Sequence, residues 1–191
     1  MNTTKDIMIV GVGGQGSLLA SKLLGSVLLA ENYDVKVSEV HGMSQRGGSV
    51  VTYVRFGDKV YSPITDKGCA DMIVSFELLE AARYTEYLKE GGTIIVNTQE
   101  INPITVITGS AKYPEKLLEK IKAKQISVDG LDALAIATEA GSQKAVNIVL
   151  MGVLSKYFDI PESAWLEAIE KCVPPKFVEL NKKAFLLGKN H

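Results

Sequence analysis

The sequence is poor in cysteine and histidine, the residues that most often hold zinc and iron–sulfur clusters. It has two of each among 191 residues, and the cysteines, Cys69 and Cys172, form no CxxC or Cys-His pattern. An iron–sulfur cluster or a structural zinc ion needs about four such ligands. The chain is therefore expected to bind no metal, and its two thiols are expected to be buried in a reducing cytosol.

The chain also lacks a strong charge of either sign and any long apolar run. Its formal net charge is -1, so no basic field favours nucleic acid. Polar residues interrupt the most apolar stretch, 18–30, which is too short to cross a bilayer, and no secretory signal precedes it. We expect a cytoplasmic protein that contacts neither nucleic acid nor membrane. Its composition predicts one globular domain over residues 1–191.

A short apolar run at 7–10 ends in a glycine-rich turn, which is typical of a strand buried on both faces of a parallel sheet. The turn, GVGGQG, matches G-x-G-x-x-G and precedes a helix expected at 15–31. Such glycines let the backbone approach a ligand, and the free amides at the helix start favour an anion. A tight packing turn is the alternative, because the motif alone is weak. The candidate phosphate-binding residues are Gly11, Gly13, Gly14, Gln15 and Gly16.

The expected helix at 15–31 is apolar on nearly every face. Its leucines and valine cover far more than the roughly 100° stripe of a surface helix. Either the helix is sandwiched inside the domain, or its outer face meets another subunit and allows self-association.

A second glycine-rich turn, HGMSQRGG, follows a strand expected at 34–40. Glu39 lies roughly 20 residues after the first motif, where a dinucleotide-binding protein places an acid for the ribose. No second crossover helix follows, however. The loop leads into a strand at 50–56, and Gly57-Asp58 predicts a hairpin turn into a strand at 59–61. The dinucleotide interpretation therefore loses weight.

The second turn presents residues suited to a substrate, to coenzyme A or to a partner. Arg46 offers a planar fork for phosphate or carboxylate, and the alternative is a salt bridge that fixes the loop. Met43 is expected to fill a subunit interface rather than to cover a ligand, and His41 to form a hydrogen bond rather than to transfer a proton. The whole candidate surface is His41, Gly42, Met43, Ser44, Gln45, Arg46, Gly47 and Gly48.

The rest of the chain predicts an α/β protein with a Rossmann-like, mostly parallel sheet flanked by helices, one β-hairpin and a helical C-terminal part. Asn147 interrupts the apolar run AVNIVLMGVL and is expected to be buried, hydrogen-bonded to one of the glycine turns and supporting it. Glu77 and Glu80 begin a helix and are expected to serve its dipole. Further strands are expected at 71–76, 93–97, 104–107 and 126–129, with helices at 78–88, 114–124, 131–140, 144–158, 161–172 and 176–187.

The pairing of GVGGQG after the first strand with EVHGMSQRGGSV after the second resembles the gamma-type (domain III) module of the 2-oxoacid:ferredoxin oxidoreductases. Within that family, the second motif is most similar to the small subunit of the indolepyruvate enzymes. The resemblance continues through AIATEAGSQKAVNIVLMGVLSKY to KFVELNKKAFLLG and so covers nearly the whole chain.

The resemblance implies a subunit of an enzyme that oxidatively decarboxylates a 2-oxoacid to an acyl-CoA and reduces ferredoxin. Thiamine diphosphate and iron–sulfur clusters are expected on a larger partner subunit, because this chain lacks the GDG…NN motif and cluster cysteines. Coenzyme A is the implied co-substrate, and the isolated chain is expected to be inactive.

Three other interpretations stay open. The chain is alternatively the gamma subunit of a pyruvate or 2-oxoisovalerate enzyme. A second alternative is a stand-alone NAD- or FAD-binding oxidoreductase that uses the glycines of the first turn and Glu39. A third is a protein that binds a nucleotide or coenzyme A without catalysis.

Overall fold

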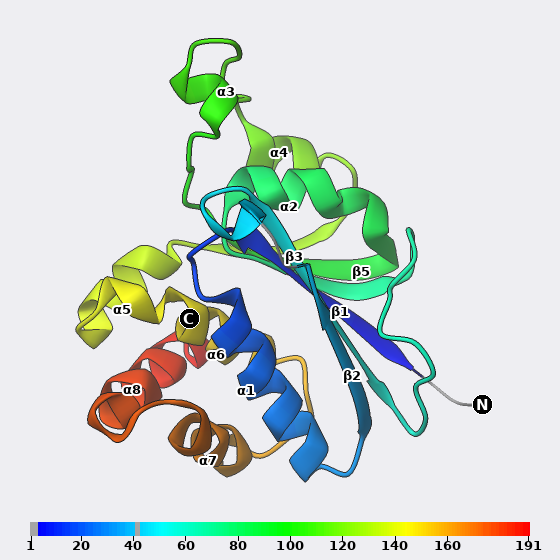
Figure 1. Ribbon diagram of the computed structural model, residues 1–191, viewed down its shortest axis with the longest axis vertical. Helices are drawn as coiled ribbons and strands as arrows, with labels where there is room; N and C mark the ends of the chain where they lie inside the picture. Colours follow the sequence, from blue (N-terminus) through cyan, green and yellow to red (C-terminus); the bar gives the residue numbers. More distant parts are fainter. Residues whose placement is uncertain (1–3, 41–42) are drawn as a thin grey trace.

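A six-stranded sheet, covered by helices on both faces, is the frame of the molecule (Figure 1). The computed structural model describes residues 4–40 and 43–191. The strands are β1 (Lys5–Val12), β2 (Asp34–Glu39), β3 (Ser49–Gly57), β4 (Ala70–Ser75), β5 (Leu88–Asn97) and β6 (Ser127–Leu131), in the spatial order β2-β3-β1-β4-β5-β6.

The pairing is parallel through most of the sheet. β1, β4, β5 and β6 pair in parallel, whereas β3 runs antiparallel to both of its neighbours, β2 and β1. The expected Rossmann-like, mostly parallel sheet with one hairpin is thereby confirmed. The central strand β1 is buried from Asp6 to Gly11, which accounts for its nearly continuous apolar sequence.

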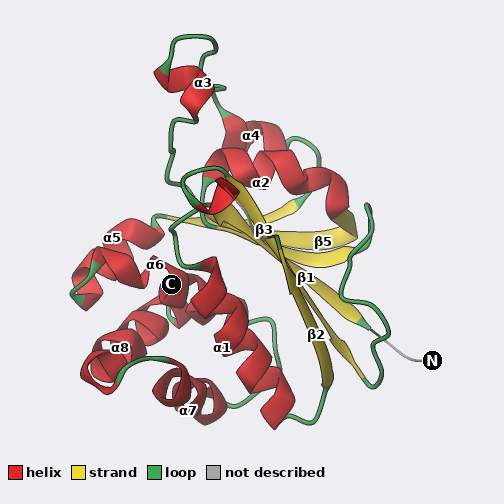
Figure 2. Cartoon of the chain, viewed as in Figure 1, coloured by secondary structure: helices red, strands yellow, loops and turns green. Residues whose placement is uncertain are grey.

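Helices form a layer on each side of the sheet (Figure 2). The helices α2 and α4 cover one face, and α1 with the C-terminal helices α5–α8 covers the other. The helices are α1 (Ser17–Ala30), α2 (Leu78–Tyr84), α3 (Ile104–Ile107), α4 (Leu117–Lys122), α5 (Ala133–Ala140), α6 (Val146–Ser155), α7 (Glu162–Cys172) and α8 (Val178–Lys189). Short 3-10 turns are η1 (Met43–Gln45), η2 (Thr85–Tyr87), η3 (Gln143–Ala145) and η4 (Pro175–Phe177).

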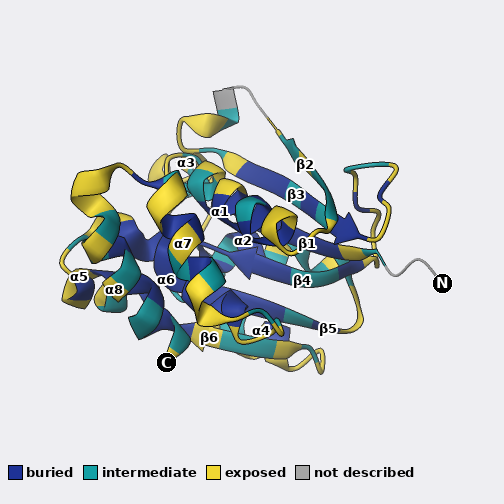
Figure 3. Cartoon of the chain, turned by 90° about the horizontal axis from the view of Figure 1, so that it is seen from below, coloured by how far each residue is buried: buried dark blue, intermediate teal, exposed yellow. Residues whose placement is uncertain are grey.

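The helix α6 lies at the centre of the C-terminal layer, and all of its residues are buried (Figure 3). It packs against α8 so closely that a Cβ on Gly152 would lie 2.1 Å from the carbonyl oxygen of Phe185. The helix α1 is largely sandwiched as well, between the sheet and the helices α6 and α7. The apolar faces of α1 are therefore explained mainly by packing within the chain, although Leu18 and Leu29 remain exposed.

The hairpin lies elsewhere than the sequence predicted. It is formed by β2 and β3, and the second glycine turn is its connection. The expected strand at 59–61 is wrong, because both edges of β3 are already occupied by β1 and β2. Side chains of β2 and β3 bind this segment instead: the amide of Val60 donates to Asp34, and Arg55 donates to the carbonyl oxygens of Ser62 and Ile64.

Two other expectations are corrected. Residues 104–107 form a helix and no strand, because β5 already pairs with β4 and β6 and Pro103 caps a helical turn. Cys69 is exposed and Cys172 only half-buried, since each lies at the end of a surface segment, so the expectation of two buried thiols is wrong. No helix within residues 4–40 and 43–191 is long and apolar enough to span a membrane.

Candidate functional site

The two glycine-rich turns meet at one edge of the sheet because β1 and β3 are antiparallel neighbours. Their register places Val12, at the end of β1, opposite Ser49, at the start of β3. The amide of Gly13 donates to the carbonyl oxygen of Gly48 at 2.9 Å. A Cβ on Gly13 would lie 2.3 Å from the carbonyl oxygen of Ser44, so a side chain there would displace the second turn. The two turns therefore form one continuous surface.

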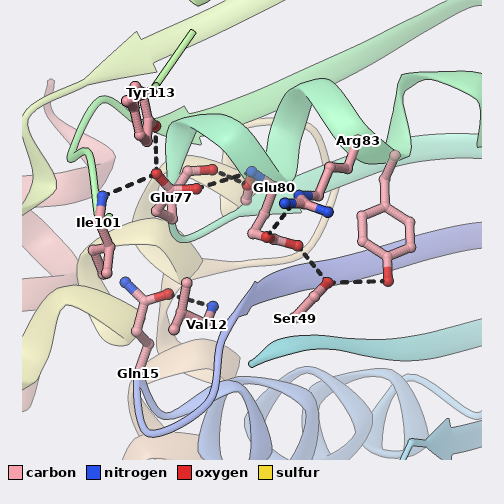
Figure 4. Close-up of polar contacts among 10 residues, drawn as sticks. Val12, Gln15, Ser49, Glu77, Glu80, Arg83, Ile101 and Tyr113 are labelled. Carbon is pink, nitrogen blue, oxygen red and sulfur yellow. Dashed lines mark hydrogen bonds and ion pairs between the residues drawn. The ribbon is translucent and has the colours of Figure 1, made fainter. Parts of the chain in front are cut away.

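Part of the first turn faces inward. The side-chain oxygen of Gln15 accepts from the amide of Val12 at 2.7 Å (Figure 4). Its amide group donates to the carbonyl oxygen of Phe76 at 3.1 Å. A Cβ on Gly11 would lie 2.9 Å from both Gln15 Oε1 and Phe76 Cβ. Gly11, Gly13 and Gln15 thus serve packing, and their contacts with the rest of the chain explain these residue types.

The remaining part of the first turn is open to a ligand. Gly14 has φ 97° with nothing near its Cβ position, and Gly16 caps α1 with φ 88°. Among the described residues, the amides of Gly14, Gly16, Ser17 and Leu18 have no hydrogen-bond partner. Unpaired amides at the start of a 14-residue helix form a site suited to an anion.

Clefts lie on both sides of this helix start. One, of about 280 Å³, runs between the first turn and the ends of β2 and β3, and is lined by Gly14, Glu39 and Gln45 among others. The second, of about 580 Å³, is bordered by Gly14, Gly16, Gln99, Ile101, Gln143 and Lys144. Gln99 and Ile101 follow the carboxyl end of β5, a position that no motif in the sequence indicated. Lys144 is the cation of the second cleft, and it forms no ion pair within the described ranges.

The second turn is largely exposed. Met43, Ser44 and Gln45 form η1, and the amide of Gly48 donates to the carbonyl oxygen of Ser44 at 2.9 Å. Arg46 is exposed and makes no ion pair with any described residue, which removes the loop-fixing salt bridge as its explanation inside residues 4–40 and 43–191. Gly47 is exposed with φ 95°. His41 and Gly42 lie outside the described residues, so the expectations on them stay predictions.

Asn147 connects the helical layer to the first turn. It is 4% exposed, and its amide group donates to the carbonyl oxygen of Gly16 at 3.2 Å. Its oxygen accepts from the amide of Ile148 at 2.9 Å. The expectation of a buried amide hydrogen-bonded to a glycine turn is confirmed.

Two buried carboxylates next to the turns, those of Glu77 and Glu80, have contacts that the sequence did not predict. Glu77 caps α2 by accepting from the amide of Glu80 at 2.9 Å, as its position at the helix start predicted. Its other oxygen accepts from Ile101 N at 3.0 Å and from the Tyr113 hydroxyl at 2.5 Å. Burial and the Glu77 carboxylate raise the pKa of Tyr113, so its hydroxyl remains a donor. These partners lie 24 and 36 positions away, and no local pattern reveals them.

Glu80 anchors the end of the second turn. It accepts from the Ser49 hydroxyl, and Arg83 lies 3.2 Å from its other oxygen (Figure 4). Burial raises the pKa of Glu80 above its ordinary value, although Ser49 and Arg83 oppose that shift. Ser49 directly follows Gly48, so this contact fixes the turn relative to α2.

The geometry speaks against a dinucleotide site. In such proteins the second glycine of the motif lets the pyrophosphate approach the backbone. Here the backbone of Ser44 and Gln45 occupies that space beside Gly13. Glu39 is one strand further from the turn than in the dinucleotide arrangement, because β3 lies between β2 and β1, and it accepts from the Ser21 hydroxyl. In the part of the chain that the structure describes, no cluster of His, Cys, Asp or Glu is placed to hold a metal ion.

Comparison with known proteins identifies the family. The model of the family described as pyruvate ferredoxin/flavodoxin oxidoreductase matches residues 6–191. The chain belongs to this family. It is 48% identical over 190 residues to indolepyruvate oxidoreductase subunit IorB of Pyrococcus horikoshii, covering 96% of this chain and 93% of that protein. It is 30% identical to the pyruvate/ketoisovalerate oxidoreductases common subunit gamma of Thermococcus litoralis, covering 93% of this chain and 90% of that one.

The fold is shared with a solved structure. The gamma subunit of the keto/oxoacid ferredoxin oxidoreductase from Geobacter sulfurreducens superimposes with a TM-score of 0.72 at 23% identity, over 97% of this chain and 96% of that one. At that identity the likeness concerns the fold alone. The two chains therefore share their overall fold over nearly their whole length.

Proposed function

We propose that this chain is the small subunit of an indolepyruvate:ferredoxin oxidoreductase, acting as one domain over residues 1–191 in the cytoplasm. The observation that carries the proposal is the 48% identity, over nearly the whole of both chains, to an indolepyruvate oxidoreductase subunit. Identity to the gamma subunit shared by pyruvate and ketoisovalerate enzymes is 30%. The difference favours an aryl 2-oxoacid as the substrate class, which the complex would convert to an acyl-CoA.

The chemistry of the complex is divided between two subunits. Thiamine diphosphate on the larger partner would supply the carbanion chemistry, and its iron–sulfur clusters would pass electrons to ferredoxin. This chain brings no cysteine cluster, since its only two cysteines are Cys69 and Cys172. Its contribution is to bind, to orient and to exclude water at the edge of the partner's site.

The residues that would do so are those of the joined turns. The amides of Gly14, Gly16, Ser17 and Leu18, which have no partner among the described residues, suit a phosphate group of coenzyme A, and Lys144 in the adjacent cleft adds a positive charge. Arg46 extends from the second turn with its guanidinium unpaired within the described residues, and would hold a carboxylate or a phosphate with two parallel hydrogen bonds. The assignment of His41 and Met43 to the same partner-facing surface stays a prediction.

The test is reconstitution with a larger, thiamine- and cluster-bearing subunit of such an enzyme. The complex would be assayed for reduction of ferredoxin with indolepyruvate, phenylpyruvate and pyruvate, each with coenzyme A. We expect activity only from the complex, with the aryl substrates used at least tenfold more efficiently than pyruvate. A preference for pyruvate or 2-oxoisovalerate would transfer the chain to the gamma subunits of those enzymes.

A second measurement addresses the stand-alone alternatives. The isolated chain would be titrated with NADH and with coenzyme A while the fluorescence of Trp165 is followed. We expect no NADH binding, because the second turn fills the space beside Gly13. Turnover by the isolated chain, or tight NADH binding, would contradict the proposal.

A further inference from the structure

One segment stands apart from the body of the molecule. Between the end of β5 and the start of α4 the chain forms an arm, residues 102–112, that carries α3 at its tip (Figure 1; Figure 2). None of these residues is buried, although the segments on either side of the arm contribute to the core. The arm therefore gains little from packing against its own chain.

The arm has a defined shape all the same. Five backbone amides between Val106 and Ala111 donate to carbonyl oxygens within the arm itself. The Thr108 hydroxyl donates to the carbonyl oxygen of Ile104 at 3.0 Å and lies 3.1 Å from the Ser110 hydroxyl. Pro103 sets the first turn of α3, and Gly109, with φ 77°, ends it. These contacts hold the tip in one conformation.

The tip presents two large apolar side chains to solvent. Ile104 is 69% exposed and Ile107 is 68% exposed. Residues three apart on a helical turn lie on the same face, so the two isoleucines form one apolar knob. Single exposed apolar residues are ordinary on protein surfaces. Two neighbouring isoleucines exposed at the tip of a projection are not ordinary in this sense.

The base of the arm is fixed by one buried carboxylate. Glu77 Oε1 accepts from the amide of Ile101, where the arm leaves the body, and from the hydroxyl of Tyr113, where it returns (Figure 4). The Glu77 residue is only 1% exposed, and its second oxygen binds the first turn of α2 through the amide of Glu80. Both ends of the arm are thus tied to the rigid helix α2. A projection held in this way loses little conformational freedom when it binds.

We infer that the arm is a docking element, and that its occupant is an apolar pocket on the larger, thiamine-bearing subunit. This inference rests on the proposed function. Stable pairing of two copies buries on the order of 1,200 Å² or more, which one four-residue helical turn with two isoleucines does not offer by itself. The arm must therefore add to a wider contact, which the proposed complex with the larger subunit would supply.

The position of the arm agrees with this occupant. Its first anchor, Ile101, also borders the larger cleft beside Gly14 and Gly16. A subunit that holds the arm consequently lies next to the turns that face its active site. The arm would set the distance between the two subunits at that edge.

The test compares a double substitution with a matched control. Ile104→Ser with Ile107→Ser removes the knob, and Leu29→Ser removes a leucine of comparable exposure (61%) near the end of α1. Binding of each chain to the immobilised larger subunit would be measured, with urea denaturation to check folding. We expect unchanged denaturation midpoints, binding weakened about a hundredfold or more in the double variant, and less than threefold in the control.

The outcomes separate the two proposals. Equal binding by the wild-type chain and the double variant would overturn the docking role of the arm and leave the proposed function standing. Absence of binding by the wild-type chain would overturn both. A wild-type chain that is dimeric in isolation, together with a monomeric double variant, would assign the arm to a second copy of this chain and so contradict the inference.

Discussion

The amide of Gly13 donates to the carbonyl oxygen of Gly48 over 2.9 Å, and this bond joins two turns that lie 35 positions apart in the chain. Each turn alone is a common glycine-rich connection. Joined by the antiparallel pairing of β1 and β3, they place the open amides of the α1 start beside the exposed Arg46 loop. A change at the contact between them should therefore affect both sides of the candidate surface.

Gly13→Ala tests that contact. The new Cβ would lie 2.3–2.4 Å from backbone atoms of Ser44 and Gln45, which cannot rotate away as a side chain can. We expect the free energy of unfolding to fall by roughly 1–3 kcal/mol, as in other overpacked sites, and the activity of the complex to fall with it. Gly25→Ala is the control, because its Cβ would meet nothing closer than 3.9 Å and the helix α1 gains about 1 kcal/mol from alanine. Urea denaturation of both variants gives the answer, and equal stabilities would contradict the packing argument.

Asn147→Ala tests the support behind the first turn. The substitution removes the bond to the carbonyl oxygen of Gly16 and leaves the amide of Ile148 without its side-chain acceptor, both in a buried place. We expect a loss of about 1–3 kcal/mol in the free energy of unfolding. Asn190→Ala, at the exposed end of α8, should change it by less than about 0.5 kcal/mol. A loss no larger at Asn147 than at Asn190 would show that the contact with Gly16 is of no consequence.

The sequence predicted the fold well where the signal is local. Apolar runs such as 7–10, glycines after strands and prolines before helices depend on a few neighbouring residues, and they placed β1, α1 and α7 within about two residues. The pairing of β3 was beyond such reasoning. A turn at Gly57-Asp58 suits a hairpin locally, but the partners of β3 were decided by competition for its two edges, which involves the whole sheet.

In the candidate site, too, local signals were predicted from the sequence and long-range contacts were not. Asn147 stood out because an amide inside an apolar helix needs a partner. Glu77 looked like an ordinary helix cap, and it is one, but its second oxygen holds Ile101 and Tyr113 through contacts that only the tertiary structure creates. Gly13 looked like a ligand-facing glycine, whereas its missing Cβ makes room for the second turn. The glycine indicated that a backbone or a ligand lies close to this position, and only the fold shows that it is the backbone of the second turn.

The buried carboxyl group of Glu80 should make the free energy of unfolding depend on pH. Burial raises its pKa in the folded state above the ordinary value of 4.5, so the folded state binds its proton more tightly than the unfolded state does. The contribution of Glu80 to stability is therefore complete below pH 4.5 and is lost as pH rises through the raised pKa. We expect Glu80→Gln to remove the part of the fall in unfolding free energy with rising pH that Glu80 causes.

The measurement is urea denaturation of wild type and variant at a series of pH values from 4.5 upward. The difference in unfolding free energy between Glu80→Gln and wild type should move in favour of the variant as the pH rises. Glu90→Gln, which replaces an exposed carboxylate by the same amide, serves as the control. A difference at Glu80 that is independent of pH would argue against the buried-carboxylate explanation.

Arg46→Ala tests whether Arg46 binds a ligand or partner or instead stabilises the fold. Its guanidinium is exposed and unpaired among the described residues, so Arg46→Ala should alter the free energy of unfolding by less than about 0.5 kcal/mol. In the reconstituted complex, however, loss of a fork that holds phosphate or carboxylate should lower kcat/KM at least tenfold, because a charge-assisted hydrogen bond contributes about 1.5–3 kcal/mol. Arg46→Lys keeps the charge without the planar fork and should recover only part of that loss. Steady-state kinetics with coenzyme A and the 2-oxoacid varied in turn locate the contact, because a raised KM for one of them alone assigns Arg46 to that molecule. Weaker binding between the subunits would assign Arg46 to the partner. Unchanged kinetics and unchanged assembly would remove Arg46 from the functional surface.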